Sequence, residues 1–135
     1  MIKRANNKKK KGFTLIELII VLAVMAIIAL IAIPNFAAVR NNSKVKADKQ
    51  SCETIEREVL MLVSDETIKT GGTAVISFND DKTFKDVKGG TGTALDADGI
   101  KLLEEQFKTL KKPQSKDTYV ITIDVNDVTV EVDVK

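Results

Sequence analysis

Hydrophobic residues follow three different patterns along the chain. From Phe13 to Ile33 every residue is apolar except Thr14 and Glu17. At ~1.5 Å per residue, a helix over 13–33 is roughly 31 Å long, which matches the ~30 Å hydrocarbon core of a bilayer. Its apolar residues cover every side, so the pattern predicts a helix buried all round, in lipid or in a bundle of helices.

A second pattern, from Asn35 to about Glu66, repeats every three to four residues. Its apolar stripe consists of Cys52, Ile55, Val59, Leu62 and Val63. The other face carries the charged residues Lys44, Lys46, Asp48, Lys49, Glu53, Glu56 and Arg57. The pattern predicts an amphipathic helix over 34–66 that packs its stripe on a small domain. Pro34 stands where the two patterns meet and predicts a kink, because proline lacks an N–H and clashes with the preceding turn.

A third pattern, strict alternation of apolar and polar residues, occupies the C-terminal end. Tyr119 to Val125 alternates, Asn126-Asp127 provides a turn, and the apolar residues that follow are Val128, Val130, Val132 and Val134. This period of two predicts a β-hairpin, and we expect its row of valines to lie against the apolar stripe of the long helix.

Shorter elements fill the space between the helix and the hairpin. The sequence predicts strands over 74–78 and 83–87 and a glycine-containing loop over 88–93. It also predicts a short helix that begins after Asp96 or Asp98 and ends at about Lys111. The expected fold class is therefore α+β. A long N-terminal helix packs with its second half on a small antiparallel sheet, and residues 67–135 form the globular head.

The net positive charge is concentrated at the N-terminus. Residues 1–11 contain six Lys or Arg and no acidic residue, so the formal charge of +2 becomes −4 for the rest of the chain. A nucleic-acid-binding head would need a clustered basic face with aromatic residues, and the sequence predicts none.

The chain has few residues of the types that act in catalysis or bind metals. It has no histidine and a single cysteine, Cys52, which cannot form a disulfide within the chain. Its place on the apolar stripe indicates a small buried hydrophobic residue. We expect no catalytic residues, no metal site and no cofactor, and hence no enzymatic activity.

The apolar segment 13–33 has several interpretations, and Glu17 separates them. A core helix would need more apolar mass around it, and a secretory signal needs a small-x-small cleavage site that the sequence lacks. A plain membrane anchor explains the lysines and the helix, but not a carboxylate that costs about 2.5–3.5 kcal/mol on insertion scales. Glu17 has a local explanation too, because Thr14-x-x-Glu17 fits a capping box.

The segment Lys8-Lys9-Lys10-Lys11-Gly12-Phe13-Thr14-Leu15-Ile16-Glu17 resembles the processing site of type IV prepilins. A basic leader, Gly, Phe, Glu five residues into the mature chain and an apolar run occur together in that order. The resemblance covers residues 1 to about 36, and Pro34 matches a proline that many members carry.

The resemblance implies a pilin fold and a set of roles. A prepilin peptidase would remove the leader, residues 1–12, by cutting between Gly12 and Phe13, and would methylate the new amine of Phe13. The Glu17 carboxylate would pair with the Phe13 amine of a neighbouring subunit and set the register of a helical homo-oligomer. The precursor would be a single-pass protein of the cytoplasmic membrane, and an assembly platform with its ATPase would build it into an extracellular fibre.

Several filaments share this fold. The first expectation is a major type IV pilin, whose fibres serve adhesion, aggregation, biofilm formation or twitching motility. The alternatives are a pseudopilin of a type II secretion or DNA-uptake machine, and a minor pilin whose head binds at a fibre tip. Relatives from Gram-negative bacteria commonly have a C-terminal disulfide loop, which this chain cannot form. That difference favours a Gram-positive, clostridial-like source.

Overall fold

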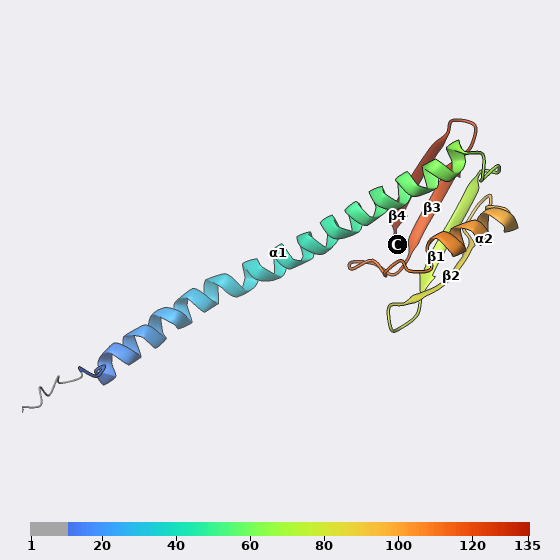
Figure 1. Cartoon of the computed structure of the whole chain (residues 1–135). Coiled ribbons are helices and arrows are strands. Elements are labelled where there is room, and N and C mark those ends of the chain that lie inside the picture. The colour runs from blue at the N-terminus through green and yellow to red at the C-terminus, as the bar shows by residue number, and fades with distance from the viewer. Residues whose placement is uncertain (1–10) are drawn as a thin grey trace, which may run out of the picture. The chain divides into compact units, whose positions relative to one another are not determined.

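The computed structural model describes residues 11–135 (Figure 1). Two helices and four strands follow in the order α1 (Leu15–Ser64), β1 (Gly72–Phe78), β2 (Phe84–Gly89), α2 (Ala97–Gln106), β3 (Tyr119–Asp124) and β4 (Thr129–Val134). The chain forms two compact units, one up to Val39 and one from Arg40 to the end.

The first unit is the apolar part of α1. Within the described residues, every side chain from Phe13 to Val39 is exposed. The helix is also long and apolar enough to cross a membrane. Helical structure continues through Pro34, and the kink expected there stays a prediction.

The second unit is built on a four-stranded antiparallel sheet in the order β2-β1-β3-β4. Alternation along each strand sends one row of side chains into the core and leaves the other row outside. The inward row consists of Ala74, Ile76, Val87, Tyr119, Ile121, Ile123 and Val132, all less than one-tenth exposed. The sheet therefore buries one face only, as is common for antiparallel sheets.

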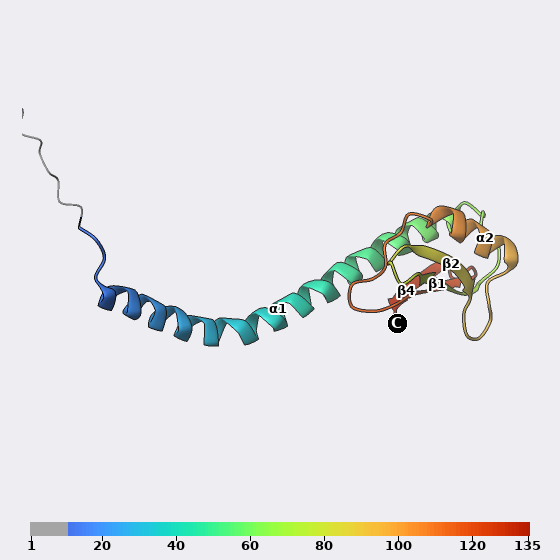
Figure 2. The same ribbon diagram turned by 90° about the horizontal axis from the view of Figure 1, so that it is seen from below.

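The second half of α1 and the helix α2 cover the same face of this sheet (Figure 2). From α1, the stripe residues Cys52, Ile55, Val59 and Val63 enter the core, as predicted, and from α2 Leu103 does so. Side chains of the two helices also meet, since the amide Nε2 of Gln106 donates to Oε2 of Glu58 at 3.4 Å. The predicted α+β arrangement, a long helix on a small antiparallel sheet, is confirmed.

The outer edge of β4 is partly covered by a side chain from α1. Oε1 of Glu56 accepts a hydrogen bond from the backbone N–H of Val132 at 3.2 Å. Unpaired N–H groups on an edge strand invite pairing with other chains, so this contact reduces the free edge of the sheet.

Several predicted boundaries were wrong, among them the ends of the short helix and of the second strand. The short helix expected to reach Lys111 ends at Gln106, because Phe107 leaves helical geometry and turns into the core, where it is 3% exposed. The second strand includes Lys88 and Gly89, which were expected in a loop, because both pair with β1. The N-terminal end of α2 is as predicted, since Asp96 accepts from the N–H of Gly99 at 2.8 Å.

The expected row of buried valines in the hairpin is only partly correct. Val132 is buried, Val130 and Val134 are half-buried, and Val128 is 46% exposed. Val128 belongs to the turn, with a φ of 52° that β-branched residues rarely adopt. Because β4 is an edge strand, the core side of the hairpin is formed mainly by the interior strand β3.

Candidate functional site

The first turn of α1 is closed by a reciprocal pair of side chains. Oε2 of Glu17 accepts from the backbone N–H of Thr14 at 2.8 Å and from its hydroxyl at 2.9 Å. The Thr14 hydroxyl in turn accepts from the N–H of Glu17 at 3.3 Å. This is a capping box, and it satisfies N–H groups that a helix leaves unpaired at its start. The capping box expected from the spacing of Thr14 and Glu17 is therefore confirmed.

The capping box uses only one oxygen of the Glu17 carboxylate. Both hydrogen bonds that Glu17 accepts end on Oε2, and within residues 11–135 no hydrogen bond reaches Oε1. The side chain can hold the box and still offer its second oxygen and its charge to another group. The cap and a role in subunit pairing are therefore compatible.

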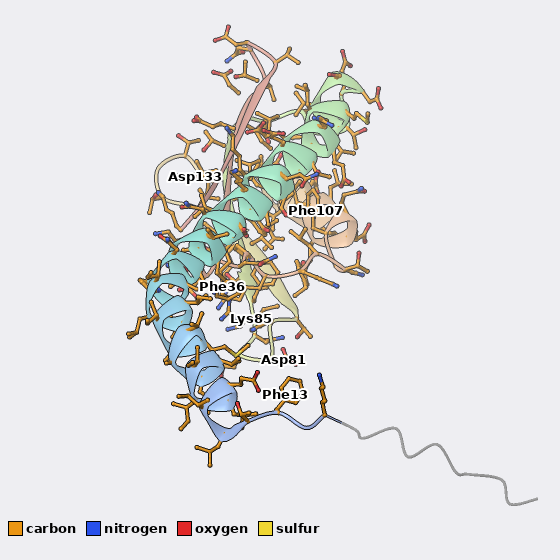
Figure 3. The ribbon with its side chains drawn as sticks, turned by 90° about the vertical axis from the view of Figure 1, so that its left-hand side faces the viewer. Phe13, Phe36, Asp81, Lys85, Phe107 and Asp133 are labelled. Carbon is orange, nitrogen blue, oxygen red and sulfur yellow. The ribbon has the colours of Figure 1, made fainter. Side chains whose placement is uncertain are left out.

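Glu17 lies in an apolar surround. Together with Phe13, Leu18, Ile20 and Val21 it lines an open hollow of about 520 Å³ on the first turns of α1. Phe13, just before the helix, is 88% exposed (Figure 3). A carboxylate within so much apolar surface is expensive in lipid or in a helix bundle unless a positive group pairs with it.

The predicted cleavage point precedes the helix. Gly12 and Phe13 are both exposed, and a Cβ added at Gly12 would meet no atom within 4 Å. The structure thus brings Phe13 and Glu17 to one hollow, whereas Pro34 lies farther along α1. The leader lysines Lys8, Lys9 and Lys10 lie outside the described residues. The cut, the methylation and the register role stay predictions.

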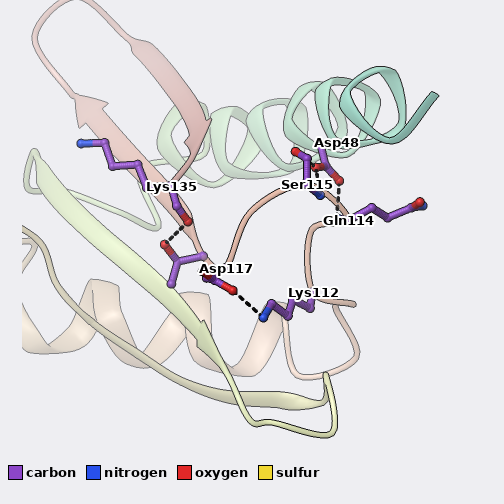
Figure 4. Close-up of polar contacts among 7 residues, drawn as sticks. Asp48, Lys112, Gln114, Ser115, Asp117 and Lys135 are labelled. Carbon is purple, nitrogen blue, oxygen red and sulfur yellow. Dashed lines mark hydrogen bonds and ion pairs between the residues drawn. The ribbon is translucent and has the colours of Figure 1, made fainter. Parts of the chain in front are cut away.

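The second unit contains a polar site that the sequence did not reveal. Asp48, expected on the charged face of α1, is 2% exposed. Its Oδ1 accepts from the backbone N–H of Gln114 at 2.6 Å, and its Oδ2 accepts from the N–H of Ser115 at 2.7 Å and from the Ser115 hydroxyl (Figure 4). The prediction that Asp48 faces water was wrong, because a loop 66 residues later supplies its partners.

Electrostatics in this region follow from burial and hydrogen bonding. Burial disfavours the charge of Asp48, but the hydrogen bonds from Ser115 and Gln114 outweigh it and hold the pKa of this carboxyl below its ordinary value. Burial, helped by Asp133 and Asp48, raises the pKa of the Cys52 thiol. Cys52 is 7% exposed, so its interpretation as a small buried hydrophobic residue is confirmed.

A sequence signal for Asp48 did exist. Asp48 precedes Cys52 by four residues and Ile55 by seven, so it lies on the apolar stripe by helical spacing. A charged residue on that stripe needs a partner to be buried. No comparable signal marks a metal centre, and among residues 11–135 no group of three Cys, Asp or Glu side chains is placed to hold an ion.

Comparison with known proteins agrees with the geometry. Residues 7–33 match the family model described as the prokaryotic N-terminal methylation motif. Prepilin peptidase-dependent protein A of Clostridium perfringens (strain 13 / Type A) is 40% identical over 118 residues, which cover 86% of this chain and 79% of that protein. No solved structure matches the chain.

A capped apolar helix that continues onto a small antiparallel sheet defines a pilin-like protein. The chain belongs to the type IV pilin family, whose precursors are the prepilins. The relative comes from a Clostridium, in agreement with the clostridial-like source expected from the sequence. Membership indicates a structural rather than an enzymatic protein, and the motif and the apolar helix fit a membrane-anchored precursor.

Proposed function

We propose that this protein is the repeating structural subunit of a type IV pilus. The observation that carries the proposal is the exposed apolar half of α1 with a single carboxylate in its first turn. Lipid covers this surface in the precursor, and neighbouring subunits cover it in the filament. Burial of apolar surface drives the association, at roughly 25 cal/mol for each Å² removed from contact with water.

Processing precedes assembly in this proposal. A prepilin peptidase cuts between Gly12 and Phe13 and methylates the new amine, a role supported by the name of the Clostridium relative and by the methylation motif. The lysine-rich leader, residues 1–12, keeps its end of the chain in the cytoplasm. Because the cut lies before the apolar helix, the mature chain keeps its anchor.

Glu17 then selects the position of the neighbouring subunit. The mature chain begins with a positive amine at Phe13, only four residues before Glu17. Inside a helix bundle each charge is costly alone, so a neighbour that places its amine near the free Oε1 of Glu17 removes both penalties. The capping box helps by fixing the direction of the carboxylate.

The filament of this proposal is an extracellular fibre made by an assembly platform and its ATPase, and it serves adhesion, aggregation or twitching. Electron microscopy of cells labelled with an antibody to the head tests this assignment. Label along the full length of abundant long fibres supports a major pilin. Label at the tips indicates a minor pilin, and label restricted to the cell body indicates a pseudopilin; either result contradicts the proposal.

A further inference from the structure

The second unit has a hollow lined mainly by positive side chains, where the start of this unit meets two loops of the head. Its volume is about 520 Å³, and the charged residues around it are Arg40, Lys44, Lys82, Lys112, Lys116 and Asp117. These residues come from α1, from the turn between β1 and β2 and from the segment before β3. We call this region the cationic hollow. It is not apparent in the sequence, because its members lie up to 77 residues apart.

Asp48 explains how the hollow forms. Arg40, Lys44 and Asp48 are spaced by four residues, so they follow one another on the same side of α1. The hydrogen bonds from Gln114 and Ser115 to Asp48 fasten the loop to that side. Consequently Lys112 and Lys116, which flank the fastened residues, lie beside the helix cations.

Most of this positive charge is not neutralised locally. Lys112 pairs with Asp117, with Nζ and Oδ1 2.6 Å apart. Within residues 11–135, Arg40, Lys44, Lys82 and Lys116 form no ion pair with a carboxylate. Asp48 is buried against the loop and Asp81 accepts hydrogen bonds from Thr83, and neither carboxylate forms an ion pair with these cations. Four cations therefore converge on one hollow without an ion pair among residues 11–135, and Asp117 is the one carboxylate beside them.

The chain itself keeps this hollow close to a membrane. Arg40 follows Ile33, the end of the apolar segment, by seven residues. Even a fully extended chain of seven residues spans only about 25 Å, and a helix of that length spans about 10 Å. In a precursor anchored by 13–33, Arg40 and Lys44 are thus near the headgroups of the leaflet on the head's side.

We propose that the cationic hollow binds the headgroup phosphates of anionic phospholipids while the subunit waits in the membrane. Basic side chains near an anionic surface are attracted to it, and the attraction is screened by salt. The bound headgroups hold the head against the lipid surface and are given up when the subunit leaves for the filament. The inference rests on the membrane-anchored precursor of the proposed function, but it does not require polymerisation.

Lysine labelling of the full chain in lipid nanodiscs tests the proposal. One set of discs contains phosphatidylcholine alone, and the other also contains phosphatidylglycerol. An amine-reactive acetylating reagent is applied, and mass spectrometry gives the rate at each lysine. We expect phosphatidylglycerol to slow the acetylation of Lys44, Lys82 and Lys116 by at least about fivefold. This factor corresponds to the attraction of one basic side chain to an anionic surface. High salt should reverse the effect.

Two triple variants provide a matched comparison. The first variant combines Arg40→Gln, Lys44→Gln and Lys82→Gln. It keeps Lys116 as the reporter, and the protection of Lys116 by phosphatidylglycerol should disappear. The control, Lys69→Gln, Lys85→Gln, Lys101→Gln, removes the same charge from exposed positions outside the hollow and should keep the protection of Lys116. Equal loss in both variants would show only a general charge effect and would overturn the proposal.

The remaining outcomes are equally decisive. If phosphatidylglycerol changes nothing while added inorganic phosphate protects the same lysines at matched ionic strength, the hollow takes free phosphate and the lipid proposal is wrong. If no lysine of the hollow responds to either, it binds no phosphate. A chain that fails to enter the discs contradicts the anchored precursor instead, so the two failures are distinguishable.

Discussion

The carboxylate of Asp48 in α1 accepts the backbone N–H and the hydroxyl of Ser115, a residue 67 positions later in the chain. This contact ties the long helix to the segment that leads into β3 (Figure 4). It also buries a negative charge at the border between the apolar core and the cationic hollow. The position of the basic loop therefore depends on this side chain.

Replacing Asp48 with asparagine should destabilise the head. The shape is kept, but asparagine has one acceptor oxygen where Asp48 uses two, so one backbone N–H of Gln114 or Ser115 loses its acceptor and the remaining hydrogen bonds lose their charge. The expected loss is about 1.5–3 kcal/mol. Thermal unfolding of the full chain in detergent micelles measures this loss. The signal is the near-ultraviolet circular dichroism of Tyr119, the only tyrosine in a chain without tryptophan. Glu53→Gln, on the same helix but exposed, should change stability by less than about 0.5 kcal/mol. Equal effects would contradict a structural role for Asp48.

The same contact makes stability depend on pH. The pKa of Asp48 is lower in the folded head than the ~3.9 of an unfolded aspartate, because its hydrogen bonds favour the charged form despite burial. The stabilisation is complete above about pH 4 and is lost as pH falls through the lowered pKa. The difference between wild type and Asp48→Asn should thus be largest near pH 7 and shrink below pH 4. A difference that grows on acidification would exclude this explanation.

Gly12→Val should block processing without affecting the head. A Cβ at residue 12 meets no atom within 4 Å, so the change costs the folded chain nothing. Any effect on processing must then arise in the peptidase, where a branched side chain next to the cut clashes. Mass spectrometry of membrane fractions should find the uncut precursor, with Tyr119 circular dichroism unchanged. Normal cleavage of the valine variant would show that Gly12 does not define the site.

Substitutions at Glu17 can separate the cap from the charge. Glu17→Gln keeps an oxygen that can accept from Thr14 but has no charge, and Glu17→Val loses both. If the charge pairs with the Phe13 amine of a neighbour, both variants should insert normally into membranes and yield at least about tenfold fewer filaments, since an unpaired buried charge costs several kcal/mol.

Thr14→Ala is the matched control for those variants. It removes the capping hydroxyl, at a cost of about 1 kcal/mol to the helix, and leaves the carboxylate in place. It should therefore assemble, and carbonate-resistant membrane fractions should contain all three variants equally. A glutamine variant that assembles like wild type would reduce Glu17 to its capping role.

Periodicity predicted the elements of this protein because it reports which face of a helix or strand is buried. The stripe from Cys52 to Val63 and the alternation from Tyr119 to Ile123 both led to the correct packing. The capping box was also predictable, since Thr14 and Glu17 are only three residues apart. Each of these features depends on local spacing alone.

Features that depend on distant partners could not be derived in this way. The helical spacing places Asp48 on the apolar stripe, but it does not reveal the partners Gln114 and Ser115, which lie 66 and 67 residues later. The end of α2 was missed because Phe107 continues the apolar spacing while its backbone has already left the helix. The exposure of Val128 follows from the turn geometry and not from its hydrophobicity.

The most direct test of the account is the mass of the subunit in purified extracellular filaments. Filaments are sheared from cells, and the N-terminal peptide of their main protein is sequenced by tandem mass spectrometry. The account predicts a chain that begins with N-methylated Phe13. Filaments whose subunit keeps the leader, or is cut elsewhere than between Gly12 and Phe13, would contradict it.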